Sequence, residues 1–226
     1  MINKAKFIPV LFTAAFFSSL TGCYCEDCGE SCSNVYDFES KLADCQKTIG
    51  HYKKGKTIHY EHSNGYDLDF TVSKDTIYHK RESEYCANFD TEVREIELTS
   101  TYPIMSLKLI FNGGYEYENE EDGSTDFISS LNVNASGVSY VVDLNSDGTP
   151  IEFSYKDNLE MLDTITFNGV KYDSVFVIYD LLYASSNDHT DKRNQPRLYF
   201  SKEKGILKIE SRVGHSLTIK EGGDNE

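Results

Sequence analysis

Positive charge is scarce in this chain of 226 residues. It carries 22 Lys and Arg against 37 Asp and Glu, which gives a formal net charge of −15 at pH 7. Binding nucleic acid, or lying flat on an anionic lipid surface, needs clustered positive charge. The composition therefore argues against a nucleic-acid partner, and the acidic excess favours solubility on an exposed surface.

Catalytic signatures are missing as well. The sequence contains no His-Glu-x-x-His, no Gly-x-Ser-x-Gly and no Gly-x-Gly-x-x-Gly, which are the patterns of zinc peptidases, serine hydrolases and dinucleotide-binding enzymes. The pair His59-x-x-His62 lies in a predicted strand, where the two side chains point to opposite faces. We therefore expect the protein not to be an enzyme.

The first 22 residues have the three regions of a secretory signal. Lys4 and Lys6 provide the basic start, and the apolar run 7–17 follows. This run is too short to span a bilayer, and no later segment approaches the ~20 apolar residues of a transmembrane helix. The run ends in Leu20-Thr21-Gly22-Cys23, which resembles the lipobox of bacterial lipoproteins. That resemblance implies cleavage in front of Cys23 and lipid on its thiol; the alternative is an ordinary secretory signal.

Residues behind the anchor add to the resemblance. Glu26-Asp27 is similar to the acidic segment of Bacteroidota lipoproteins. The triplets Asp75-Thr76-Ile77, Asp163-Thr164-Ile165 and Asp173-Ser174-Val175 match the O-glycosylation pattern of that phylum. The resemblance implies an outer-membrane protein held by fatty acyl chains, of the palmitate type, on the periplasmic side or the cell surface. We expect a signal peptide over 1–22, a tether over 23–33, one β-rich domain over 34–222 and a disordered tail over 223–226.

The domain is predicted to be all-β. Short segments of alternating polarity are separated by turn signals such as Asn64-Gly65, Asn112-Gly113-Gly114 and Asn168-Gly169. No strand–helix alternation appears, which favours an antiparallel β-sandwich or a barrel-like meander. A short N-terminal helix is predicted over 34–50 from Val35, Phe38, Leu42, Cys45 and Ile49. The predicted strands are 57–61, 66–72, 76–81, 95–99, 105–111, 127–133, 138–144, 151–155, 162–167, 174–181, 197–201, 206–210 and 216–220. The polar stretch 185–196 is expected to be a mobile loop or the edge of a binding site.

The remaining cysteines fall into two groups. Cys25, Cys28 and Cys32 lie in the tether, where disulfides or loose thiols are favoured over a metal site. Cys45 and Cys86 lie in the folded domain, and a disulfide bridge between them is predicted. Such a bridge would stabilise the fold by about 3–4 kcal/mol in the chain-entropy model.

One motif suggests a cation. Asp143, Asn145 and Asp147 offer side-chain oxygens at positions one, three and five, Gly148 stands at six, and the Thr149 carbonyl is available at seven. This resembles a calcium loop and allows weak calcium binding. Positions nine and twelve lack the usual ligands, however, and the alternative is a hairpin turn.

Two functions remain open at this point. The first is a non-enzymatic binding or structural domain with a glycan, lipid or protein partner. The second is a hydrolase, or a lipid or glycan carrier, whose site is assembled from scattered residues. A deep pocket with converging polar groups would favour the second, and a filled core under a flat acidic surface would favour the first.

Overall fold

The computed structural model describes residues 36–84, 87–102, 105–118, 125–135, 137–151, 159–180 and 195–220. These residues form an all-β domain with a single short α-helix, which confirms the predicted fold class. The strands are β1 (Tyr36–Ser40), β2 (Thr57–His62), β3 (Asp67–Glu84), β4 (Ala87–Ser100), β5 (Ser106–Glu118), β6 (Thr125–Ala135), β7 (Val138–Leu144), β8 (Leu159–Phe167), β9 (Val170–Tyr179), β10 (Arg197–Ser201), β11 (Gly205–Glu210) and β12 (Ser216–Ile219). Helix α1 (Asp44–Thr48) and the 3-10 turn η1 (Ile49–His51) precede β2.

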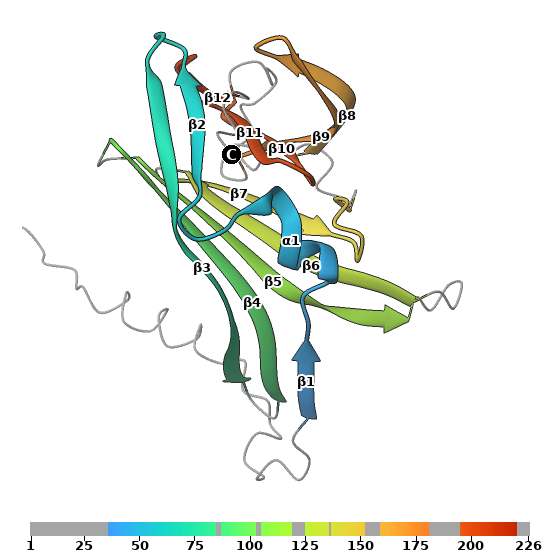
Figure 1. Ribbon diagram of the computed structural model, residues 1–226. Coiled ribbons are helices and arrows are strands. Elements are labelled where there is room, and N and C mark those ends of the chain that lie inside the picture. Colours follow the sequence, from blue (N-terminus) through green and yellow to red (C-terminus); the bar gives the residue numbers. More distant parts are fainter. Residues whose placement is uncertain are drawn as a thin grey trace, which may run out of the picture.

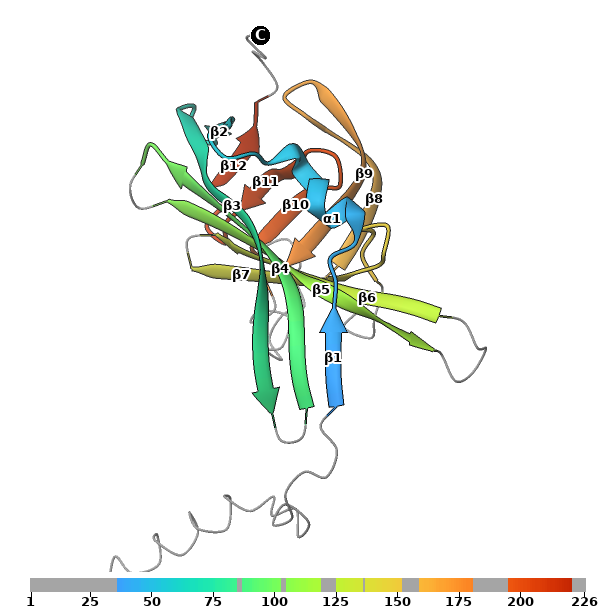
Figure 2. The ribbon, with the colours of Figure 1, turned by 60° about the horizontal axis from the view of Figure 1, so that its bottom comes forward.

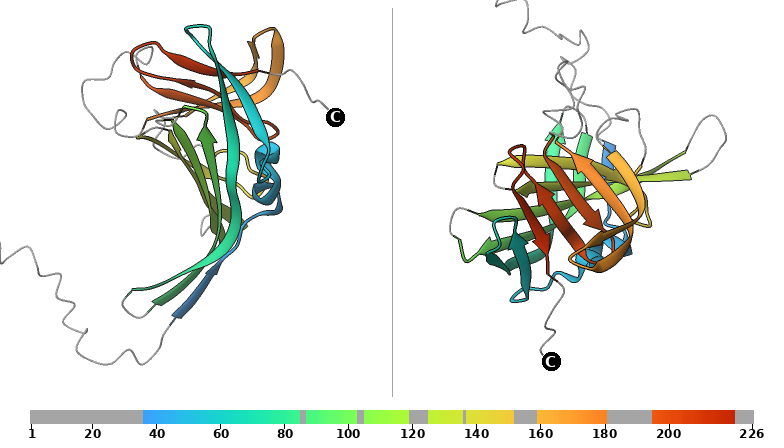
Figure 3. Two further views of the ribbon diagram at one scale, coloured as in Figure 1. Left: turned by 60° about the vertical axis from the view of Figure 1, so that its left-hand side comes forward. Right: turned by 90° about the horizontal axis from the view of Figure 1, so that it is seen from above.

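All twelve strands belong to one sheet. Its order is β7-β6-β5-β4-β3-β2-β12-β11-β10-β9-β8, with β1 added in parallel to β4, and every other pairing is antiparallel. The sheet curls until β7 lies beside β9, which gives a nearly closed, barrel-like shape (Figure 1). Figure 3 shows the red C-terminal strands β10–β12 facing the green and yellow strands across the barrel. Inward-pointing apolar side chains from all sides form one core.

Two predicted turns are β-bulges instead. Residues 73–75, the turn that separates the predicted strands 66–72 and 76–81, lie inside β3, whose pairing with β4 shifts between Val72 and Lys74. The expected turn at Asn112-Gly113-Gly114 likewise lies inside β5, whose pairing with β6 shifts there. Turn residues also suit bulges, because both need an unusual backbone path. A Cβ on Gly113 would lie 2.8 Å from the carbonyl oxygen of Ser40, so glycine allows β5 to pass close to the chain that leaves β1.

The predicted helix over 34–50 is wrong for its first half. Residues 36–40 form β1, which pairs with Ala87–Thr91 of β4, and the helix is confined to residues 44–48. The segment Tyr-Asp-Phe-Glu-Ser also alternates with period two, and β4 offers it an edge to bond to. Phe38 stacks on its register partner Phe89 at a ring distance of 5.2 Å. Backbone pairing with β4 therefore prevails over a weak helical period.

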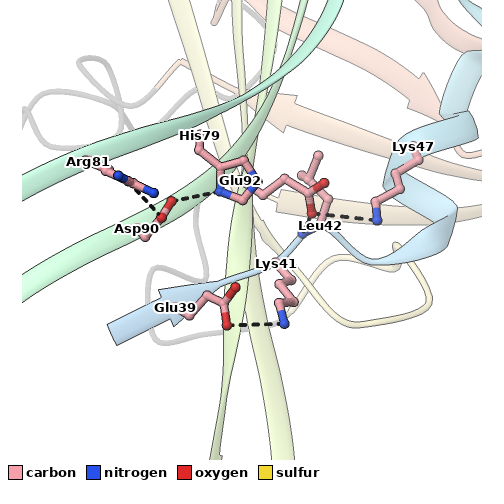
Figure 4. A network of polar contacts seen from close by, with 8 residues as sticks. All are labelled: Glu39, Lys41, Leu42, Lys47, His79, Arg81, Asp90 and Glu92. Atoms are coloured by element: carbon pink, nitrogen blue, oxygen red, sulfur yellow. Dashed lines mark hydrogen bonds and ion pairs between the residues drawn. The ribbon is translucent and has the colours of Figure 1, made fainter. Parts of the chain in front are cut away.

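Two arms extend beyond the barrel. Figure 2 shows β1, β3 and β4 continuing as one arm, while the hairpin of β5 and β6 leaves in another direction. Polar contacts on the first arm tie it to the helix region (Figure 4). Asp90 accepts hydrogen bonds from His79 Nδ1 at 2.7 Å and from Arg81 Nε at 3.1 Å, and Glu92 accepts the backbone N–H of Leu42 at 2.9 Å.

Helix α1 and η1 close one end of the barrel. The buried Gln46 side chain donates to Ser129 in the middle of β6, and the buried Tyr52 hydroxyl accepts the backbone N–H of Ile206 near the start of β11. Arg94, 2% exposed, donates to the carbonyl oxygens of Gln46 and Tyr52 at 2.9 and 3.1 Å. The N-terminal segment thus acts as a plug, which we define as residues 42–52.

Candidate functional site

A cavity of about 420 Å³ opens at the end of the barrel opposite the plug. The plug contacts Ser129 in the middle of β6 and Ile206 near the start of β11, whereas the cavity is lined by later residues of the same strands, Ala135 and Ile209. Its walls also come from the starts of β5, β7 and β12. The apolar lining residues are Met105, Leu107, Ala135, Val138, Tyr140, Ile209, Val213 and Leu217.

Strand register places these side chains on one face. Leu107 of β5 pairs with Ala135 of β6, and Ala135 pairs with Val138 of β7, so three neighbouring strands present apolar groups at the same level. Alternate residues of a strand share a face, which directs these side chains inward. Ala135 and Val138 are small, and they leave space. Farther into the barrel the space is filled by large buried rings, namely those of Tyr60, Phe70, Phe111, Phe176 and Phe200.

Two histidines form one side of the cavity rim. His62 ends β2 and His215 precedes β12, and their ring centroids are 5.4 Å apart. The ring of His62 also stacks on Tyr66 at 4.4 Å with an interplanar angle of 12°. Burial, followed by the neighbouring His215, lowers the pKa of His62 below its ordinary value. His62 is therefore neutral at pH 7, with its ring held in place by two aromatic neighbours.

A buried polar pair lies elsewhere in the lining. Asp180 follows β9 and is 5% exposed, and Tyr140 of β7 is fully enclosed. Burial, and then the Asp180 carboxylate, raise the pKa of Tyr140 well above its ordinary value. The Tyr140 hydroxyl thus stays protonated at any pH at which the protein would work. The cavity combines carbon-lined walls with a few polar groups, which is the pattern of small-molecule sites.

Sequence reasoning found little of this cavity. In the sequence, His62 stands out only through its spacing from His59, and nothing near His215 indicates a site. His62 and His215 come together only through the pairing of β2 with β12. The expected binding edge at residues 185–196 is represented by Pro196, which lines the cavity. Residues 185–194 lie outside the described part of the chain.

The predicted calcium loop is a hairpin turn in the structure. The Asn145 N–H donates to the Thr149 carbonyl at 2.8 Å, and the Gly148 N–H donates to the Asn145 carbonyl at 2.9 Å. Asp147 Oδ1 accepts both the N–H and the hydroxyl of Thr149, at 2.9 and 2.6 Å. Asp143 lies in β7, paired with Ser130, and burial raises the pKa of its carboxyl. Within the described ranges there is no group of three or more His, Cys, Asp or Glu that could hold a metal ion.

The predicted disulfide is not formed in the structure. Cys45 carries a free thiol, which donates to the Ser146 carbonyl at 3.2 Å, while Cys86 lies outside the described residues. Ala87 pairs with Tyr36 at the start of β1, whereas Cys45 follows the far end of that strand. A disulfide needs Cα atoms within about 7 Å of each other, and β1 alone spans more than this. Cys23, Cys25, Cys28 and Cys32 also lie outside the described residues.

The segment 50–57 matches the spacing Gly-x-x-x-x-Gly-Lys-Thr of a phosphate-binding loop. Such a loop leads into a helix, whose N-terminal amides hold the phosphate. Here the segment leads into strand β2, and the backbone N–H of Gly55 is bonded to the Val72 carbonyl at 2.8 Å. Lys56 donates its backbone N–H to the Lys53 carbonyl in a tight turn. The segment therefore has the residue spacing of a phosphate-binding loop but not its structure.

A second hollow lies on the β1–β3–β4 arm, between residues such as Asp37, Phe38 and Arg81. Its charged groups are largely paired with one another. The hydrogen bond from His79, above all, lowers the pKa of Asp90, and Asn88 donates to Asp37 at 2.9 Å. These contacts show that the polar residues of this hollow hold the strands of the arm together. The barrel cavity is therefore the stronger candidate for a binding site.

Helices in the described ranges are all too short and too polar to cross a membrane. Comparison with protein-family models, with curated proteins and with solved structures finds no match for this chain.

Proposed function

We propose that this chain is a lipid-anchored protein of a bacterial envelope whose β domain binds a small, largely apolar molecule in the barrel cavity. The observation that carries the proposal is the cavity itself. Its volume of about 420 Å³ falls within the roughly 300–1,000 Å³ of small-molecule sites, and the mouth of a β-barrel is a common place for one.

The lining favours binding over chemistry, and a lipid-like ligand over a glycan. Eight of the lining residues are apolar, and most of the polar ones lie at the end of β11 and in the turn before β12, apart from the buried Asp180. A sugar would leave its hydroxyl groups without partners against such walls, at a cost of about 1–3 kcal/mol for each buried group. An aliphatic or aromatic ligand meets no such cost.

The anchor is supported by the Leu20-Thr21-Gly22-Cys23 motif at the end of the signal-like segment. The described domain begins at Tyr36, 13 positions after Cys23. That length of chain spans at most ~45 Å, which keeps the barrel close to the membrane surface. With lipid on Cys23, the acidic domain needs no membrane-binding face of its own, and an outer-membrane location on either side suits the arrangement.

A cavity-filling variant tests the binding site. The neutral dye N-phenyl-1-naphthylamine fluoresces in apolar surroundings, and purified full-length protein should enhance its emission in a saturable way. Ala135→Phe places a ring in the cavity and should abolish this enhancement. Ala87→Phe, the same substitution on the β4 arm, is the matched control and should leave it unchanged. Equal emission from both variants, or none from the parent protein, would contradict the proposal.

A further inference from the structure

We infer that the ligand is an anionic amphiphile, an aliphatic carboxylate whose chain fills the cavity and whose head lies at the rim beside His62 and His215. This inference rests on the proposed function, because it assigns a ligand class to the same cavity. It is carried by three features of the rim: where its cationic groups lie, how its acidic groups are engaged, and how His62 is oriented.

Groups that can carry positive charge gather on one side of the cavity. His62 ends β2, His215 precedes β12, and Arg212 lies in the turn between β11 and β12; all three line the cavity. The pairing of β2 with β12 brings the first two together, with Leu217 opposite His62. In a chain with a net charge of −15, these three side chains give an anion a place at the rim where hydrogen-bond donors lie close together.

The acidic residues of the lining are engaged elsewhere. Glu210 ends β11, and its carboxylate is paired with Arg197 Nε at 2.6 Å and with Lys208 Nζ at 2.5 Å. Asp180 follows β9 and is buried beside Tyr140. The charged and titratable residues around His62 are thus those of the cavity lining and its stacking partner: His215, Arg212, the paired Glu210, the buried Asp180, Tyr140 and Tyr66. An anion that enters the cavity therefore meets hydrogen-bond donors at the rim. The carboxylate of Glu210 is already paired with cations, and that of Asp180 is buried.

His62 is oriented as a donor. The backbone N–H of Asn64 donates to His62 Nδ1 at 3.1 Å, so the neutral ring carries its proton on Nε2. Stacking on Tyr66 and contact with His215 hold the ring. A carboxylate can accept the Nε2–H, and a charge-assisted bond of this kind is stronger than a neutral one.

Binding of an anion would favour the protonated form of His62. Since burial and His215 lower the pKa of His62, its ring is neutral at pH 7 before an anion binds. An anion at Nε2 opposes this lowering and favours imidazolium, in which Nδ1 is protonated and releases the Asn64 N–H, so binding takes up a proton. The affinity for a carboxylate should therefore increase as the pH falls from 7.5 to 6, whereas the affinity for an uncharged molecule of the same length should not.

Displacement of N-phenyl-1-naphthylamine from the full-length protein by decanoate and by decan-1-ol tests the inference. The two competitors share a chain and differ in the head. His62→Phe keeps a ring on Tyr66 but removes the donor, and it should weaken decanoate binding about tenfold while leaving decan-1-ol unchanged. His59→Phe, on the same strand and outside the cavity lining, is the matched control and should behave like the parent protein.

The outcomes separate the two proposals. If the dye never binds, the proposed cavity function fails. If the dye binds but His62→Phe weakens both competitors equally, or neither, the cavity stands and the anionic head is refuted. Preference for decylamine over decanoate at pH 6 would refute it as well. A decanoate affinity that does not change between pH 7.5 and pH 6 would exclude the histidine role.

Discussion

Arg94 and Asp75 are joined by two parallel hydrogen bonds inside the barrel. Arg94 Nε donates to Oδ1 of Asp75 at 2.9 Å, and Nη2 donates to Oδ2 at 3.1 Å. The same guanidinium holds the carbonyl oxygens of Gln46 and Tyr52, which belong to the plug. One buried cation thus connects β3, β4 and the segment that closes the barrel, and the far end is left as the entrance to the cavity.

Replacing Arg94 should destabilise the protein strongly. Arg94→Met leaves the Asp75 carboxylate and two plug carbonyls without their donor, and removing one partner of a buried pair costs about 3–5 kcal/mol. The free energy of unfolding, measured by urea denaturation, should fall by that amount. Arg81→Met is the matched control on β3: the Arg81 side chain is 83% exposed, and its loss should change stability by less than about 1 kcal/mol. Equal effects of the two variants would show that Arg94 does not hold the plug.

Glu95 should make the free energy of unfolding depend on pH in acidic solution. Its carboxylate accepts from Lys74 at 2.7 Å and lies 3.0 Å from Lys108, and the hydrogen bond from Lys74 is the main reason that its pKa falls to about 2. A depressed pKa stabilises the folded state above the ordinary value near 4.5, and this contribution is lost as the pH falls from 4.5 toward 2.

The variant Glu95→Gln tests this dependence. It should lower the free energy of unfolding by about 1–2 kcal/mol at pH 6 and should flatten its decline between pH 4.5 and pH 2. Glu82→Gln is the control, because Glu82 also pairs with a lysine, Lys80, but its side chain is 57% exposed, and this variant should keep the decline of the parent protein. Urea denaturation over this pH range measures both, and identical profiles for the parent protein and Glu95→Gln would contradict the assignment.

Strand positions follow closely from the sequence where alternation and turn residues agree. Strand β7 has the predicted bounds, Val138–Leu144, because turn residues stand directly before it and shortly after it. Where a turn signal lies inside a long strand, local chemistry cannot separate a turn from a bulge. Residues 73–75 illustrate this, since only the pairing of β3 with β4 decides that the chain continues.

The cavity was harder to predict, for a physical reason. Its two histidines are 153 positions apart, and neither has a neighbour along the chain that indicates a site. They meet because β12 pairs with β2, a long-range contact that local period and spacing do not encode. For the calcium motif, in contrast, the local sequence indicates a site too readily. Asn145, Asp147 and Gly148 have the spacing of a calcium loop, and the same residues also favour a turn.

The turn interpretation predicts a negative result for calcium. Asp147 Oδ1 already accepts two hydrogen bonds from Thr149, and a cation at this oxygen would compete with them. Titration of the full-length protein with millimolar calcium in a calorimeter should show no heat beyond dilution. Saturable heat that disappears in Asp147→Asn would revive the calcium loop.

Cys45 should be a slow-reacting free thiol. Burial raises the pKa of its thiol, so less thiolate is present at neutral pH, and thiolate is the reacting form. Iodoacetamide at pH 7.5 should label Cys45 several-fold faster in urea than in the folded protein, as followed by peptide mass spectrometry. Mapping without reduction should recover Cys45 unlinked, and a Cys45–Cys86 peptide in that map would show that the bridge predicted from the sequence forms after all.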